Sequence, residues 1–158
     1  MESKVLILRL DEDRNRKLEE IIDKLKESGL TNISKTRLYH FSGALGFYNG
    51  KREKLSSKTF DATRVEFLSR PDYKIQNVIL ESIYKSQKDN LDGENDKYRL
   101  FEEYANAGVE ILYNLYKNSS DVEEFLENLE LEIYKVMEKL GLNNKEENQD
   151  EEIWRRIL

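Results

Sequence analysis

The sequence contains no cysteine, one proline and one histidine among its 158 residues. The absence of cysteine excludes disulfides and thiolate metal sites. The scarcity of proline, together with only seven glycines, leaves few helix breakers and favours long helices over many short strands. No apolar run approaches the roughly 18 residues that a membrane span requires, and the N-terminal run Val5–Leu10 is also too short for the core of a signal peptide. We therefore expect a cytoplasmic protein with no membrane segment.

Apolar residues recur at helical spacing in five segments of the chain. The spacing predicts helices over residues 11–28 and 35–45, from Pro71 through Ile83, from Phe101 through Leu115, and from Ser120 to Gly141. Residues 5–10, VLILRL, are either a short strand or the start of a hydrophobic anchor, and residues 56–70 show no readable pattern. The sequence thus predicts a mostly α fold, with one helical domain over residues 1–142. We expect a compact bundle of about five helices with a short N-terminal strand.

Two serines are placed where helices would begin. Ser34 precedes the second helix and can act as its N-cap. Ser120 and Glu123 have the spacing of a capping box, in which each side chain accepts a hydrogen bond from the other residue's backbone N–H. We therefore expect Ser120 to cap the last helix.

Residues 143–158 are predicted to form an acidic tail that ends in a short amphipathic segment. The large apolar residues of this segment are Ile153, Trp154, Ile157 and Leu158. Apolar residues after a polar stretch favour either docking in the groove of a partner or docking back on the chain's own core. We take Ile153, Trp154 and Ile157 as candidate partner contacts.

Groups that could carry out catalysis are few. The only histidine, His40, lies mid-helix between Tyr39 and Phe41, and no cysteine can serve as a nucleophile. The many glutamates of the last two helices lie beside apolar stripes, as the residues of solvated helix faces do. The acidic loop that begins at Asp89 lacks oxygen ligands at the positions that a calcium loop requires. We predict no catalytic residue, no metal site and no cofactor, and therefore a protein that is not an enzyme.

Charge is unevenly distributed along the chain, whose formal net charge is −6. The first 60 residues hold 13 Lys/Arg and 9 Asp/Glu, whereas the remaining residues hold 13 and 23. The acidic body opposes general binding to phosphate backbones, but the first half has basic and aromatic residues that suit nucleic acid or an acidic partner. These candidate contacts are Lys35, Arg37, His40, Tyr48, Lys51, Arg52 and Lys54.

A solvated helix face followed by a turn is the alternative interpretation of these basic residues. If the turn binds a partner, Lys51→Glu with Arg52→Glu should weaken that binding and leave the fold intact.

Two motifs, taken together, resemble a known family. Ala44-Leu45-Gly46-Phe47, with Gly50 and Arg52 after it, is followed by Phe101-Glu102-Glu103-Tyr104-Ala105-Asn106-Ala107-Gly108. Their order and separation resemble the small proteins called DNA phosphorothioation-associated protein 4, or dnd system-associated protein 4, over roughly residues 10–140. The family has no established catalytic motif to transfer. The motif residues therefore transfer only as structural or interface positions, and we take Phe101, Tyr104 and Asn106 as candidate partner contacts.

The resemblance implies a non-enzymatic accessory subunit of a prokaryotic anti-phage DNA-defence system, one that links phosphorothioate modification to restriction. Its implied partners are the larger ATPase and nuclease subunits of that system. DNA is a further candidate partner through the N-terminal basic region, and a homodimer is compatible with the same role.

The order of the first elements also matches a different class of protein. A strand at VLILRL, a helix over residues 11–28 and a helix from Ser34 follow the order of a ribbon-helix-helix transcriptional regulator. Such a regulator dimerises through the strand and places the strand's outward side chains in the major groove of DNA. The two alternative outward sets are both too apolar for base readout: Val5, Ile7 and Arg9, or Leu6, Leu8 and Leu10. This regulator is therefore the second hypothesis.

Overall fold

A computed structural model of the chain describes residues 6–90, 96–141 and 157–158. Within these residues the chain forms five α-helices and one two-stranded antiparallel sheet. The strands are β1 (Ile7–Asp11) and β2 (Thr59–Arg64). The helices are α1 (Glu12–Glu27), α2 (Lys35–Tyr48), α3 (Lys74–Gln87), α4 (Asp96–Lys117) and α5 (Val122–Lys139). Three short 3-10 helices are η1 (Val65–Ser69), η2 (Pro71–Tyr73) and η3 (Lys88–Asn90). The predicted fold class, a mostly α bundle of about five helices with a short N-terminal strand, is confirmed.

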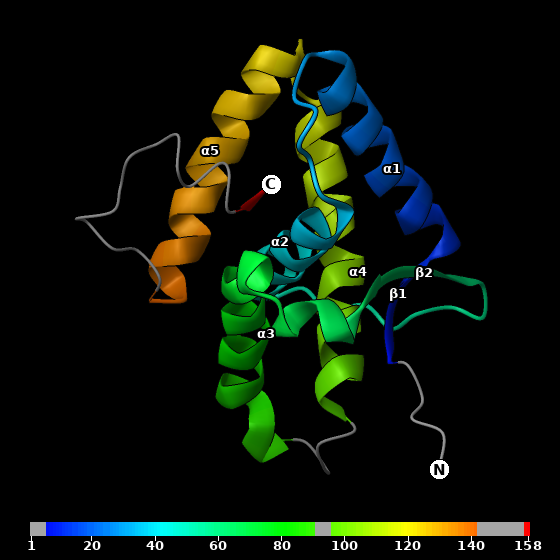
Figure 1. Cartoon of the computed structure of the whole chain (residues 1–158), viewed down its shortest axis with the longest axis vertical. Coiled ribbons are helices and arrows are strands. Elements are labelled where there is room, and N and C mark those ends of the chain that lie inside the picture. Colours follow the sequence, from blue (N-terminus) through cyan, green and yellow to red (C-terminus); the bar gives the residue numbers. More distant parts are fainter. Residues whose placement is uncertain (1–5, 91–95, 142–156) are drawn as a thin grey trace.

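Helix α2 lies at the centre of the bundle and packs most extensively against α4 (Figure 1). Its apolar residues with no exposed surface are Leu38, Tyr39, Phe41, Ala44 and Leu45. These residues lie on all sides of the helix, and a helix that is apolar all round belongs in the interior of a domain. The amphipathic helices α1, α3, α4 and α5 surround α2, so the core of the protein is built around it.

The two strands form a small antiparallel sheet at one side of the bundle (Figure 1). Leu10 of β1 pairs with Phe60 of β2, and the side chains of Leu8 and Leu10 are fully buried. The sequence did not predict β2, because TFDATR lacks the alternation of apolar and polar residues that indicates a strand. Its position depends on pairing with β1 and on a buried hydrogen bond of 2.7 Å between the hydroxyls of Thr36 and Thr63.

The helix ends agree with the predictions in part. Ser34 caps α2 as predicted, and its hydroxyl accepts a hydrogen bond from the Arg37 N–H at 3.3 Å. Helix α5 is capped by Asp121 and not by Ser120, since the Asp121 carboxylate accepts a hydrogen bond from the Glu124 N–H at 2.8 Å. The Glu124 carboxylate in turn accepts one from the Ser120 N–H at 3.2 Å. The predicted N-cap, Ser120, is therefore one residue before the observed one, Asp121. The sequence does not distinguish the two, because aspartate and serine are equally good caps.

The last two residues pack into the core of the chain. Ile157 and Leu158 are only 2% and 4% exposed. The backbone N–H of Ser34 donates a hydrogen bond to a Leu158 backbone oxygen at 2.7 Å. The prediction of Ile157 as a partner contact is therefore wrong, because the residue docks on its own chain. The other predicted contacts of the tail, Ile153 and Trp154, lie outside the described residues.

Candidate interaction surfaces

The two sequence motifs meet where α2 crosses α4. A Cβ added at Gly108 would lie 1.6 Å from the carbonyl oxygen of Ser42, and one added at Gly46 would lie 2.1 Å from the carbonyl oxygen of Tyr104. Both are approaches of one backbone to another, which glycine permits because it has no side chain. The motifs therefore specify a contact between two helices, not an exposed site.

The polar residues of the second motif cover the outer edge of β1. The Arg9 N–H donates to the Glu102 carboxylate at 2.7 Å, and the Asp11 N–H donates to the Asn106 side-chain oxygen at 3.1 Å. Burial raises the pKa of Glu102, and the hydrogen bond from Arg9 opposes that shift. Since β2 pairs with the other edge, β1 has no edge open for pairing with a second copy. The arrangement contradicts the ribbon-helix-helix hypothesis, which requires that pairing.

The motif residues predicted as partner contacts are buried within the chain. Phe101 is 1% exposed, Tyr104 is 8% exposed and Asn106 has no exposed surface. The ring of Phe101 packs against Tyr39 with ring centres 5.9 Å apart, and the ring of Tyr104 packs edge-on against Phe47 at 5.6 Å. The prediction that these three residues form an interface is wrong, because they belong to the chain's own core.

His40 is also buried, with no exposed surface. Its Nδ1 lies 2.7 Å from the carbonyl oxygen of Thr36, which can only accept, so Nδ1 carries the proton. Burial lowers the pKa of His40 from 6.5 to about 4, although the hydrogen bond to Thr36 acts in the opposite direction. A neutral ring inside the core cannot contact nucleic acid or a partner, and this prediction is wrong as well.

The predicted basic turn is exposed, but one of its three cations is held by an ion pair with α4. The Nε of Arg52 donates to the carboxylate of Glu103 at 2.6 Å, and the Glu103 side chain is only 7% exposed. Lys51 and Lys54 are exposed and form no ion pair with any described residue. Arg52 therefore helps to hold the fold, and the expectation that its replacement by glutamate leaves the fold intact is not compatible with this pair.

The other predicted contacts lie on separate parts of the surface. Lys35 forms an ion pair with Glu19 of α1 at 3.0 Å. The guanidinium of Arg37 lies over the ring of Tyr73 at 5.4 Å. The ring of Tyr48 lies under a lysine ammonium of α5 at 5.3 Å. The predicted contacts of the first half thus lie against four different elements: Lys35 against α1, Arg37 against η2, Arg52 against α4 and Tyr48 against α5.

A family model described as DNA sulphur modification system-associated protein 4 matches residues 7–152. The chain belongs to this family. The suspected resemblance is thereby confirmed, and it ties the protein to a DNA sulphur modification system. The chain matches neither a curated protein nor a solved structure. Among the residues that the structure describes, no helix has the length and apolar character that crossing a membrane would require.

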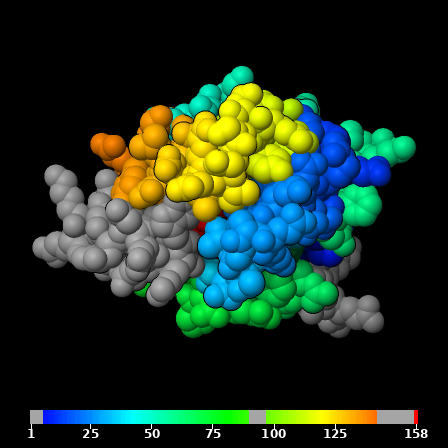
Figure 2. Space-filling model, turned by 90° about the horizontal axis from the view of Figure 1, so that it is seen from above, coloured from blue at the N-terminus to red at the C-terminus, as the bar shows by residue number. Residues whose placement is uncertain are grey.

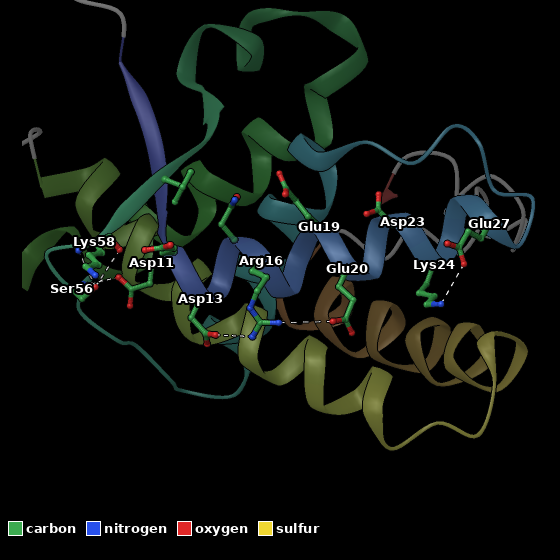
Figure 3. A pocket seen from close by; sticks show the side chains of 13 residues that line it. Asp11, Asp13, Arg16, Glu19, Glu20, Asp23, Lys24, Glu27, Ser56 and Lys58 are labelled. Carbon is green, nitrogen blue, oxygen red and sulfur yellow. Dashed lines mark hydrogen bonds and ion pairs between the residues drawn. The ribbon is translucent and has the colours of Figure 1, made fainter.

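The outer side of α1 offers this family member a different surface, an open hollow of about 940 Å³. Most of the labelled side chains in Figure 3 follow α1 along its length, and Asp11, Ser56 and Lys58 lie at its N-terminal end. Helix α1 lies at the outside of the molecule, beside α4, in Figure 2. Seven carboxylates line the hollow: Asp11, Glu12, Asp13, Glu19, Glu20, Asp23 and Glu27. The other lining residues are Arg16, Lys24, Lys58, Asn15, Ser56 and Phe60. We call this surface the acidic α1 face.

Ion pairs along the acidic α1 face hold some of its carboxylates. Asp13 accepts from Arg16 at 2.8 Å and lies 3.2 Å from the ammonium of Lys17. The hydrogen bonds from Arg16 and Lys17 lower the pKa of Asp13 from 3.8 to about 2. Arg16 also lies 4.0 Å from Glu20, so the dashed lines of Figure 3 join these side chains into a short chain along the helix.

The acidic α1 face was not predicted from the sequence, because the helix was assigned from its aliphatic stripe. A signal was available, since Glu19, Asp23 and Glu27 recur at i, i+4 and i+8 and therefore lie on one side of the helix. Phe60 could not be added from the sequence, because its place beside α1 depends on the pairing of β2 with β1.

Proposed function

We propose that the protein is a non-enzymatic accessory subunit of its DNA sulphur modification system and acts by binding larger protein subunits. The family assignment supports the link to the system. The non-enzymatic role is supported by the contacts of the three side chains most capable of acid–base chemistry. His40 is buried and neutral, Glu102 binds the edge of β1, and Glu103 binds Arg52. Each of these groups maintains the fold.

The proposed role places the protein in the cytoplasm, in anti-phage defence, with ATPase or nuclease subunits of the same system as partners. Few cations of the first half are free to contact DNA. Lys51 and Lys54 are exposed, but Lys35, Arg37 and Arg52 each interact with another part of the chain. The acidic α1 face would repel phosphate groups.

A pull-down from the native host, with tagged protein and with or without nuclease treatment, tests the proposal. Recovery of an ATPase or nuclease subunit that survives nuclease treatment is the expected result. Recovery of DNA with no protein partner would instead favour a nucleic-acid-binding protein. Hydrolysis of ATP or cleavage of DNA by the purified chain would overturn the non-enzymatic assignment.

A further inference from the structure

We propose that the acidic α1 face is the docking surface for a basic, amphipathic segment of a partner protein, with Phe60 as its apolar anchor. The inference rests on the proposed function, since it names the chemistry of the partner that an accessory subunit would bind. Three observations support it: the spread of the carboxylates, a carboxamide oxygen among them without a hydrogen-bond partner in the described part of the chain, and an exposed aromatic ring at the same hollow.

The carboxylates are spread along a helix, as a long ligand requires. Helix α1 has 16 residues and is therefore about 24 Å long. Among the described residues, no three acidic or histidine side chains converge closely enough to hold a metal ion. Seven carboxylates and three cations line the hollow, so its charge is net negative. Carboxylates spread in this way suit a ligand with several lysines or arginines in a row better than a single ion.

Two of the carboxylates are available without breaking any contact. Glu12 and Asp23 are exposed and form no ion pair with any described residue. They lie eleven positions apart on α1, or roughly 16 Å along its axis. Other acids of the face, such as Glu27, form solvent-exposed ion pairs, which are weak and can be exchanged for a partner's cation.

Asn15 is a polar residue of this hollow whose side-chain oxygen has no hydrogen-bond partner among the described residues. The residue is 7% exposed and lines the hollow between the acids at either end of α1. Its side-chain oxygen is buried and accepts no hydrogen bond from any described residue. A buried polar atom without a partner is costly, and a lysine or arginine entering the hollow supplies the missing donor.

Phe60 gives the hollow an apolar end. Phe60 is 50% exposed, although Leu10, the residue of β1 that pairs with it, is fully buried. Exposed aromatic side chains that a partner then covers are the usual anchors of protein interfaces. Nucleic acid does not suit the surface, because phosphates are repelled by it, and a second copy would bring the same acidic face. A basic segment with an apolar side fits both the charge and the ring.

The test uses the full chain and a fluorescent amphipathic peptide of lysine, arginine and leucine, about as long as α1. Glu12→Gln with Asp23→Asn is expected to raise the Kd for this peptide about fivefold, and Phe60→Thr about tenfold. The control, Glu127→Gln with Glu138→Gln, removes the same charge from exposed positions of α5 and should leave the Kd nearly unchanged. An equal loss in the control would show attraction to net charge alone and would overturn the proposal.

Asn15→Leu separates binding from stability. Removal of the unpaired oxygen is expected to raise the urea midpoint of unfolding and to weaken peptide binding. If binding is unchanged, the carboxamide does not serve the ligand.

A second arm repeats the host pull-down with the Glu12, Asp23 and Phe60 changes combined. Loss of the subunit that wild-type protein captures supports the docking surface. Unchanged capture would overturn this inference while leaving the accessory role in place, whereas no capture by wild-type protein would count against the proposed function itself.

Discussion

The crossing of α2 and α4 leads to a quantitative prediction for Gly108→Ala. The added Cβ would lie 1.6 Å from the carbonyl oxygen of Ser42 and 2.5 Å from its carbonyl carbon. Neither atom can rotate away, because both belong to the backbone of a buried helix. To reach ordinary van der Waals contact the two helices would have to separate by roughly 2 Å.

The free-energy cost of separating α2 from α4 depends on the side chains that are packed where the two helices cross. Alanine in place of glycine favours a helix by about 1 kcal/mol. Overpacking costs about 1–3 kcal/mol where side chains can adjust, and more where they cannot. Separation of α2 from α4 also loosens the packing around Leu45 and Phe101, each of which is at most 1% exposed. We therefore expect a net loss of about 3 kcal/mol, a large part of the 5–15 kcal/mol that a domain typically has.

Urea denaturation followed by circular dichroism measures this loss, with two matched variants. A Cβ at Gly43 would lie 2.3 Å from the ring of Phe101, a side chain that can shift, so Gly43→Ala should cost less, about 1–2 kcal/mol. Asn114→Ala, at an exposed position of α4, should leave stability unchanged or slightly raised. A Gly108→Ala variant as stable as wild type, or a Gly43→Ala variant that is less stable than Gly108→Ala, would refute the reasoning.

Three further predictions concern single side chains. Arg52→Ala leaves the buried Glu103 carboxylate without its partner and should lower the free energy of unfolding by about 1–2 kcal/mol, while Lys51→Ala has no effect in the same urea assay. The unfolded chain binds a proton at His40 below pH 6.5 but the folded chain only near 4, so stability is full above 6.5 and falls as the pH drops toward 4. From about pH 7 to about pH 5 this group should remove about 2 kcal/mol, a loss absent from His40→Gln. Asn106→Ala removes an acceptor at the edge of β1 and should speed hydrogen exchange of the strand's amides, measured by NMR against the amides of α5.

The helices could be predicted because their signals are local. Leu18, Ile21, Ile22 and Leu25 repeat at helical spacing within eight residues, and all four are buried in α1. The cap at Ser34 needs only the residues next to it. Each of these features is fixed by neighbours in the sequence, so the sequence contains the information directly.

The features that could not be predicted depend on residues far apart in the chain. Strand β2 exists because β1 lies beside it, and its own residues carry no strand pattern. Asn106 looked like an exposed polar residue, but its side chain meets Asp11, which is 95 positions away. Arg52 looked like a free cation, but it meets Glu103, which is 51 positions away. Polarity alone indicated that Asn106 is exposed and that Arg52 is unpaired. Burial of Asn106 and the ion pair of Arg52 reversed these two interpretations.

The family could be identified from residues at the centre of the bundle, which determine the fold. Gly46 and Gly108 are restricted because two backbones touch there, so a resemblance carried by their motifs transmits the fold. A surface that binds a partner has no such packing requirement and leaves no comparable pattern in a single sequence. The family motifs therefore locate the centre of the bundle. The residues that we propose to contact a partner, Glu12, Asp23 and Phe60, are instead exposed groups outside these motifs.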